Sequence, residues 1–141
     1  MGEEASMKEA YVERVKQDIE ALYGRDYRFE RDSHVKGYYQ ESQVDIAVRT
    51  RSRLAVAAID VDVLNDDLDW TQRMGRAANL RLAGIPYHVA YVIPPHMVQS
   101  PTLGRAVQSV SFDGTDTPHL PNRAWFILAE TDQAEPLQPP M

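Results

Sequence analysis

Three carboxylates interrupt the two most apolar strand-like runs of this chain. Asp45 lies within residues 44–48, and Asp60 and Asp62 lie near the end of residues 54–63. Strand side chains alternate between the two faces of a sheet, so Asp60 and Asp62 share one face. A carboxylate on a buried sheet face costs roughly several kcal/mol unless a cation or hydrogen-bond donors meet it. The three aspartates are therefore the strongest functional signal in the sequence.

Length and composition indicate one globular domain. The 141 residues are 43% hydrophobic, which suffices for a single core, and we predict a domain over 1–130 and a flexible tail over 131–141. The absence of cysteine excludes disulfides, thiolate zinc sites and thiol nucleophiles. No apolar stretch is long enough to span a bilayer and the N-terminus is acidic, so we expect a cytoplasmic protein without a membrane partner.

The charge distribution limits the partners. A net charge of −6 argues against a strong non-specific grip on nucleic acid. Local basic clusters remain possible, and Arg49, Arg51 and Arg53 lie together before the third predicted strand. This cluster has two interpretations, a small phosphate-binding patch or a contribution to solubility.

Hydrophobic periodicity and turn residues predict an αβββαβ order. The predicted elements are a helix at 7–23, strands at 27–31, 43–49 and 54–63, a helix between cap residues 65–67 and Gly84, a strand at 86–93, a short helix at 102–110, a loop at 112–122 and a strand at 124–129. This order predicts an α/β fold with a mixed central sheet flanked by helices, extended by a C-terminal helix and strand.

That order and the position of the acids resemble the PD-(D/E)xK nuclease superfamily, whose members share a restriction-endonuclease-like core. Asp45 in Val44-Asp45-Ile46 matches the aspartate of the family's second strand. Asp60 matches the acid of the E-x-K step, shortened from glutamate, and Asp62 stands where most members have lysine.

One branch, similar to very-short-patch repair endonucleases, is nearer to this chain. It reads I-E-x-D-G and later A-G-I/L-P, and this chain has Ile59-Asp60-Val61-Asp62-Val63 and Leu82-Ala83-Gly84-Ile85-Pro86. The glycine is replaced by Val63, and the histidine that follows in the branch is missing. Gln72-Arg73 stands near the branch's Arg-Asp pair without matching it.

The resemblance implies a nuclease that uses Mg²⁺ or Mn²⁺ to hydrolyse phosphodiester bonds, with DNA expected before RNA. Carboxylate oxygens suit these ions, and a bound ion lowers the pKa of the attacking water. In this interpretation Asp45 and Asp60 hold the metal, and Asp62 is a further ligand or the general base. Asp18, on the first predicted helix, is a fourth candidate ligand; its alternative role is an ion pair with Arg14.

Basic and aromatic residues supply candidate substrate contacts. Gln72, Arg73 and Arg76 lie along one side of the second predicted helix, where arginines could bind phosphate or simply face solvent. Lys36 in the hairpin turn is either a relocated catalytic lysine or an ordinary turn residue. Four tyrosines could stack on bases or belong to sheet faces: Tyr38, Tyr39, Tyr87 and Tyr91.

Two other functional hypotheses compete with the nuclease. The acidic net charge and the missing lysine, glycine and histidine favour a catalytically inactive nuclease-fold module that acts in protein interaction or scaffolding. A small helix–sheet domain unrelated to nucleases is indicated if the second and third strands are not neighbours. Carboxylates that share a pocket favour a functional site, whereas carboxylates that face bulk water indicate only a generic domain.

Overall fold

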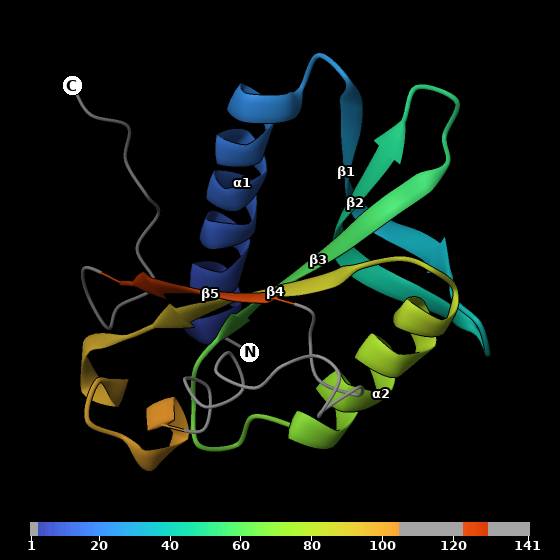
Figure 1. The fold of residues 1–141 in the computed structure, drawn as a ribbon. Helices are drawn as coiled ribbons and strands as arrows, with labels where there is room; N and C mark the ends of the chain where they lie inside the picture. Colours follow the sequence, from blue (N-terminus) through green and yellow to red (C-terminus); the bar gives the residue numbers. More distant parts are fainter. Residues whose placement is uncertain (1–2, 105–122, 130–141) are drawn as a thin grey trace.

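The computed structural model describes residues 3–104 and 123–129 (Figure 1). The elements are α1 (Glu3–Tyr23), β1 (Tyr27–Lys36), β2 (Glu41–Thr50), β3 (Ala55–Val63), α2 (Trp70–Leu82), β4 (Tyr87–Ile93), the 3-10 helix η1 (Pro95–Met97) and β5 (Arg123–Leu128). The predicted αβββαβ order and the last strand are confirmed. Residues 101–104 are helical, as expected for the start of the helix predicted at 102–110. The rest of that helix, the loop predicted at 112–122 and the tail lie outside the described residues.

The five strands form one mixed sheet in the order β1-β2-β3-β4-β5. β1, β2 and β3 pair antiparallel, whereas β3, β4 and β5 pair parallel. Parallel neighbours need a crossover, and helix α2 supplies it between β3 and β4. Because β2 and β3 are neighbours, the criterion that would indicate an unrelated helix–sheet domain is not met.

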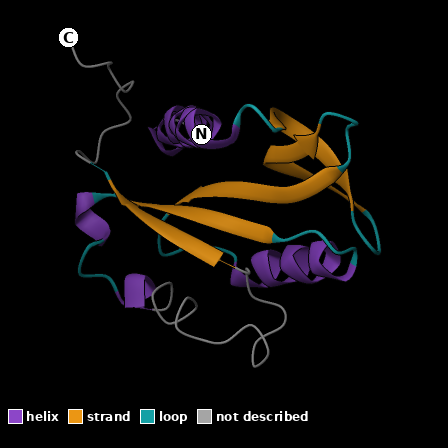
Figure 2. Cartoon of the chain, turned by 45° about the horizontal axis from the view of Figure 1, so that its top comes forward, coloured by secondary structure: helices purple, strands orange, loops and turns teal. Residues whose placement is uncertain are grey.

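The sheet lies between two helical layers, with α1 over one face and α2 over the other (Figure 2). Each layer encloses an apolar cluster. The cluster beneath α1 includes Met7, Tyr11, Val12, Val15, Phe29, Ile46, Ile59, Val61 and Val92. The cluster beneath α2 includes Val35, Val44, Ala58, Ala77, Leu80, Tyr87, Val89 and Tyr91. The alternation of Ala58 and Ile59 between the two clusters confirms that β3 is covered on both faces.

Helix α1 begins at Glu3 rather than at the predicted Met7. The helix is fastened to β1 through Arg31, whose guanidinium lies 2.5 Å from Glu9 and 2.9 Å from Glu13. No helix within residues 3–104 is long and apolar enough to cross a membrane.

Helix α2 also starts at a different residue from the one predicted. Its N-cap is Asp69, whose Oδ1 accepts the Gln72 N–H at 3.0 Å, and not the segment 65–67. Asn65 instead closes a local turn by accepting the Asp67 N–H at 2.8 Å. Gly84, with φ of 81°, follows the C-terminus of the helix as predicted, because this conformation is costly for other residues.

The turn between β1 and β2 is anchored to α2 by Asn79. The buried amide accepts the N–H groups of Tyr39 and Gln40 at 2.7 and 3.2 Å, and donates to the Gln40 carbonyl and Ser42 at 2.9 and 3.0 Å. Gly37 is required by this contact, because a Cβ there would lie 2.1 Å from the Asn79 nitrogen. The hairpin end is therefore held in one position on the helix.

Candidate acidic site between the sheet and helix α2

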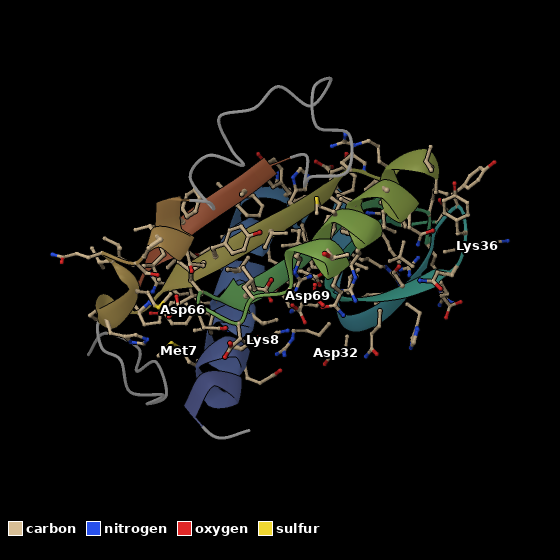
Figure 3. The ribbon with its side chains drawn as sticks, turned by 90° about the horizontal axis from the view of Figure 1, so that it is seen from below. Met7, Lys8, Asp32, Lys36, Asp66 and Asp69 are labelled. Atoms are coloured by element: carbon tan, nitrogen blue, oxygen red, sulfur yellow. The ribbon has the colours of Figure 1, made fainter. Side chains whose placement is uncertain are left out.

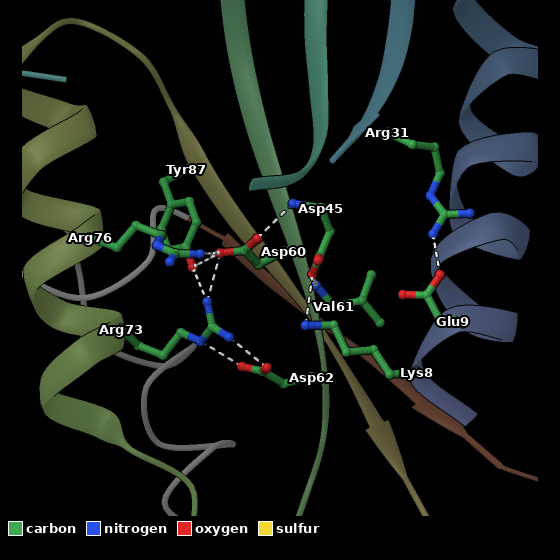
Figure 4. A network of polar contacts seen from close by, with 10 residues as sticks. All are labelled: Lys8, Glu9, Arg31, Asp45, Asp60, Val61, Asp62, Arg73, Arg76 and Tyr87. Carbon is green, nitrogen blue, oxygen red and sulfur yellow. Dashed lines mark hydrogen bonds and ion pairs between the residues drawn. The ribbon is translucent and has the colours of Figure 1, made fainter. Parts of the chain in front are cut away.

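The candidate site lies on β3, where Asp60 and Asp62 point toward α2 (Figure 4). As predicted from strand alternation, both share a face with Ala58, which packs in the cluster beneath α2. Asp60 is 1% exposed and Asp62 is 8% exposed. Neither carboxylate faces bulk water, so the alternative that these acids are solvated strand ends is wrong for this pair.

Asp60 accepts four hydrogen bonds. Its Oδ2 accepts from Arg73 Nη1, Arg76 Nη1 and the Tyr87 hydroxyl, each at 2.6 Å. Its Oδ1 accepts the backbone N–H of Asp45 at 2.9 Å. The Tyr87 hydroxyl also accepts from Arg73 Nη1 at 2.6 Å, which closes a three-membered network. Each carboxylate oxygen has about two acceptor positions, so these donors fully use Oδ2, whereas Oδ1 holds a single donor.

Asp62 is bound by the same arginine. Arg73 Nη2 donates to Asp62 Oδ1 at 2.5 Å, and Arg73 Nε forms an ion-pair contact with Oδ2 at 2.5 Å. The planar guanidinium therefore faces one carboxylate with two nitrogens and reaches the other with the third. Arg73 is itself buried, so it acts as an internal counter-ion for both acids.

Asp45 and Asp60 replace backbone pairing where β2 separates from β3. The strand ladder ends at the pair Ile46 and Ile59. Beyond it, Asp60 accepts the Asp45 N–H, and Asp45 Oδ2 accepts the Val61 N–H at 2.8 Å. Lys8 of α1 lies 3.4 Å from the same Asp45 oxygen. The two carboxylates thus satisfy main-chain donors that would otherwise lose their partners at this point.

Near Asp45, the side chains of the β1–β2 hairpin switch from one face of the sheet to the other. Asp32 on β1 has φ of 50°, a conformation that aspartate tolerates better than most residues. Before this point on β1, Phe29 packs beneath α1, and after it Val35 packs beneath α2. On β2, Val44 and Ile46 likewise belong to opposite clusters. The bend brings the far end of the hairpin to Asn79 on α2.

The two aspartates that share hydrogen bonds have opposite pKa shifts. Burial acts to raise the pKa of Asp60, but Arg73, Arg76 and the Tyr87 hydrogen bond outweigh it, so the pKa lies below its ordinary value of 3.8. The pKa of Asp45 is raised, first by burial and then by the negative charge of Asp60. Lys8 only partly offsets these effects. The ionised form is therefore favoured at Asp60 and disfavoured at Asp45.

The pKa values of Arg73 and Tyr87 are shifted in directions that keep the hydrogen bonds to Asp60 intact. Burial opposes the charge of Arg73, but Tyr87, Asp62 and Asp60 outweigh it and raise the pKa of Arg73. Burial, assisted by Asp60, raises the pKa of the Tyr87 phenol well above 10.0. At neutral pH the site therefore contains a charged arginine, an ionised Asp60 and a neutral tyrosine that can donate.

The predicted metal site does not fit this arrangement. Within residues 3–104 and 123–129, no group of three or more His, Asp or Glu side chains is placed to hold a metal ion. The oxygens of Asp60 face guanidinium and phenol groups, and those of Asp62 face Arg73. A divalent ion would have to displace these donors before it could reach both carboxylates.

The other predicted site residues lie outside this network. Asp18 is exposed on α1 and does not reach the three aspartates, and Arg14 lies over the Tyr11 ring rather than on Asp18. Gln72 is exposed and contributes only its backbone N–H to the helix cap. Lys36 is the last residue of β1 and pairs with Glu41, and Figure 3 shows it well apart from Lys8.

The site includes residues that sequence reasoning assigned elsewhere. The helix pattern predicts that Arg73 either binds phosphate or faces solvent, yet Arg73 precedes Ala77 by four residues and Leu80 by seven, which puts it on the buried stripe. That spacing is a signal of a buried arginine in need of an acid. Tyr87 was considered a sheet-face residue and is one, but no pattern indicated that its hydroxyl meets Asp60.

The tyrosines divide into two groups. Tyr87 and Tyr91 are fully buried. Tyr38 and Tyr39, at the Asn79-anchored turn, are 63% and 73% exposed, and their rings stand edge to face with centroids 4.9 Å apart. The turn therefore presents two aromatic side chains on a fixed backbone.

No family model matches the chain, and no curated protein or solved structure matches it. Function must therefore be inferred from the contacts of Asp45, Asp60 and Asp62. Chemically, this arrangement neutralises buried charge and joins β2, β3, β4 and α2.

Proposed function

We propose that this chain is a restriction-endonuclease-like domain that acts as a catalytically inactive module in protein interaction or scaffolding. The αβββαβ order supports this fold, as does the placement of Asp45 on β2 beside Asp60 on β3. Exposed aromatic residues such as Tyr38 and Tyr39 support an interaction role, because aromatic side chains are enriched at protein interfaces.

The saturation of Asp60 Oδ2 by side chains of the same protein carries the proposal. Arg73, Arg76 and Tyr87 converge on Asp60 Oδ2, an oxygen that a metal ion held by this carboxylate would have to share with them. Removing one partner from a buried ion pair costs about 3–5 kcal/mol, so opening this site for a metal is expensive. Asp62, which replaces the family's lysine, is also committed to Arg73. The cations that make the carboxylates tolerable are arginines.

A metal-dependent nuclease acting on DNA, with Mg²⁺ or Mn²⁺, is the second candidate. One observation favours it: Asp45 keeps a raised pKa beside Asp60, with Lys8 3.4 Å away as its cationic contact. Negative charge is therefore incompletely compensated there, and an added cation at Asp45 and Asp60 would relieve it. This function requires Arg73 and Arg76 to leave Asp60.

Calorimetric titration with Mn²⁺ separates the two candidates. The wild-type protein, Asp45→Asn and Asp60→Asn are compared, with Asp18→Asn as a matched control at an exposed aspartate. The inactive module predicts no saturable heat that depends on Asp45 or Asp60. Asp45→Asn retains an acceptor for the Val61 N–H, so it should stay folded even if Asp60→Asn does not.

Incubation with single- and double-stranded DNA and RNA plus Mn²⁺ completes the test. We expect no cleavage products above those of Asp60→Asn. A Mn²⁺ site lost in Asp45→Asn and kept in Asp18→Asn, together with cleavage, would establish the nuclease and reject the inactive module.

A further inference from the structure

A second cluster of arginines lies at the opposite end of the β1–β2 hairpin from Tyr38 and Tyr39. The connection from α1 to β1 and the turn from β2 to β3 meet at this end (Figure 1). The guanidinium of Arg51 donates to the Arg25 carbonyl and joins the two segments. We call this surface the basic end and define it by Tyr23, Arg25, Arg28, Arg51, Arg53 and Leu54.

The arginines of the basic end are available to an external anion. All four are exposed. In the part of the chain that the structure describes, the guanidiniums of Arg25, Arg28 and Arg53 make no ion pair or hydrogen bond. Glu30, the acid nearest to Arg28 on β1, is taken by Arg49 at 2.8 Å. These arginines therefore differ from Arg73 and Arg76 of α2, which are already paired with aspartates.

The basic end reverses the charge of the protein locally. Residues 21–28 and 51–54 hold four arginines and one aspartate, a net charge of +3. The whole chain carries −6, so the remaining residues carry −9. An anionic partner is attracted to this end and repelled by the rest of the molecule.

The basic end also includes two exposed apolar side chains. Tyr23 is 54% exposed and Leu54 is 66% exposed. Large exposed apolar groups within a charged rim are typical of protein-binding surfaces, where tyrosine and arginine contribute much of the affinity. The turn that carries Leu54 is ordered by Thr50, whose N–H donates to the Leu54 carbonyl at 2.9 Å and whose hydroxyl accepts the Leu54 N–H at 3.1 Å.

We propose that the basic end binds an acidic segment of a partner protein, in which Asp or Glu side chains alternate with apolar ones. Arginine clusters recognise acidic motifs through paired hydrogen bonds to carboxylates, and Leu54 and Tyr23 cover the apolar side chains between them. This inference names a partner class for the proposed interaction module and rests on that function.

Charge and shape favour a peptide over a nucleic acid. A long polyanion would extend beyond the basic end and meet the acidic remainder of the chain, whereas a short acidic segment fits within it. Phosphate contacts would use the arginines but would leave Leu54 without a role, because leucine neither stacks on bases nor binds phosphate.

Selection from a random peptide library displayed on phage, with the intact protein immobilised, tests this. We expect enrichment of peptides that combine Asp or Glu with Leu, Phe or Trp. Synthetic versions of the selected peptides should bind at least about tenfold more weakly to Arg28→Glu/Arg53→Glu. Arg14→Glu/Lys36→Glu is the matched control, because it removes two exposed cations elsewhere and should change affinity by less than about twofold.

Leu54→Ser provides a second test that leaves the charge unchanged. It should weaken binding several-fold, whereas Leu82→Ser, at an exposed leucine of α2, should not. The inference is overturned if selected peptides lack acidic residues, if both charge variants lose affinity equally, or if no peptide is enriched. Binding of oligothymidylate or of phosphatidylserine vesicles at the basic end, in place of peptides, also overturns it. Peptides that bind at Tyr38 and Tyr39 instead would reject the basic end but retain an interaction module.

Discussion

The protein uses arginine in two opposite ways. Beneath α2, Arg73 and Arg76 are directed inward and hold Asp60 and Asp62. At the basic end, Arg28 and other arginines are exposed and have no carboxylate partner among residues 3–104 and 123–129. The first group contributes to folding, because buried acids could not be tolerated without it. The second contributes little to folding and is free to act on another molecule.

The comparison distinguishes charged residues that bind an external ligand from charged residues that stabilise the core by pairing with each other. A buried carboxylate signals a missing cation, but the cation can be a side chain rather than a metal ion. Asp60 illustrates the case, since it binds the helix that follows its own strand. An unpartnered exposed cluster is the better indicator of an external ligand.

The largest difference between the two groups is expected in stability. Arg73→Ala removes the counter-ion of two buried aspartates, so the free energy of unfolding should fall by about 3–5 kcal/mol. Arg28→Ala, at an exposed arginine, should change it by less than about 0.5 kcal/mol. Urea unfolding of both variants at pH 7 measures the contrast. Similar losses in both would mean that Arg73 is not an internal counter-ion.

The pH dependence distinguishes Asp60 from Asp45. Since the pKa of Asp60 is lowered on folding, its contribution to stability is complete above pH 3.8 and is lost as the pH falls below that value. Asp60→Asn should therefore be less stable than wild type at pH 7 by about 3–5 kcal/mol, and the deficit should shrink in acid.

Asp45 should behave in the opposite way, because its pKa is raised on folding. Its contribution is present below pH 3.8 and lost as the pH rises through the raised pKa. Asp45→Asn should therefore gain stability relative to wild type between acid and neutral pH. Urea unfolding across pH 3 to 7 checks both signs. A deficit that grows with pH for Asp45→Asn would contradict the charge assignment.

The Tyr87 hydroxyl should contribute less than the arginine. Tyr87→Phe removes one donor to Asp60 and one acceptor from Arg73 without a large change in volume. A loss of about 1–2 kcal/mol is expected, because both partners retain other contacts. Tyr23→Phe, at an exposed tyrosine of the basic end, should be neutral in the same thermal or urea unfolding measurement.

The sequence predicted the fold well because its local signals agree. Alternation in β3, the Gly84 stop and the crossover between β3 and β4 each have one simple physical cause. Helix starts were less predictable. Asp69, rather than Asn65, caps α2, because both residues can close a turn and only the tertiary position of the helix decides between them.

The candidate site was predicted in part. Pattern alone indicated that Asp60 and Asp62 share a buried face and need a positive partner. It did not identify that partner, because the pairing of Asp60 with Arg73 depends on where α2 crosses the sheet. The hydrogen bond of Asp45 could not be predicted either. Its carboxylate accepts the Val61 N–H at the point where β2 separates from β3, and no local sequence motif indicates that separation.

The smallest expected effect on stability is that of Arg53→Gly, which tests whether arginine at this position of the basic end lowers the stability of the fold. Arg53 has φ of 73°, a conformation that glycine adopts without strain. Arg53→Gly should therefore leave stability unchanged or raise it by about 0.5 kcal/mol, since relief of strain is partly offset by added freedom in the unfolded chain. The same variant should bind the selected acidic peptides more weakly, whereas Arg14→Gly, within α1, should lose stability and keep binding. A variant that gains stability while losing a ligand would indicate that arginine occupies position 53 for recognition. Unchanged peptide binding in Arg53→Gly would instead reduce the basic end to its three other arginines.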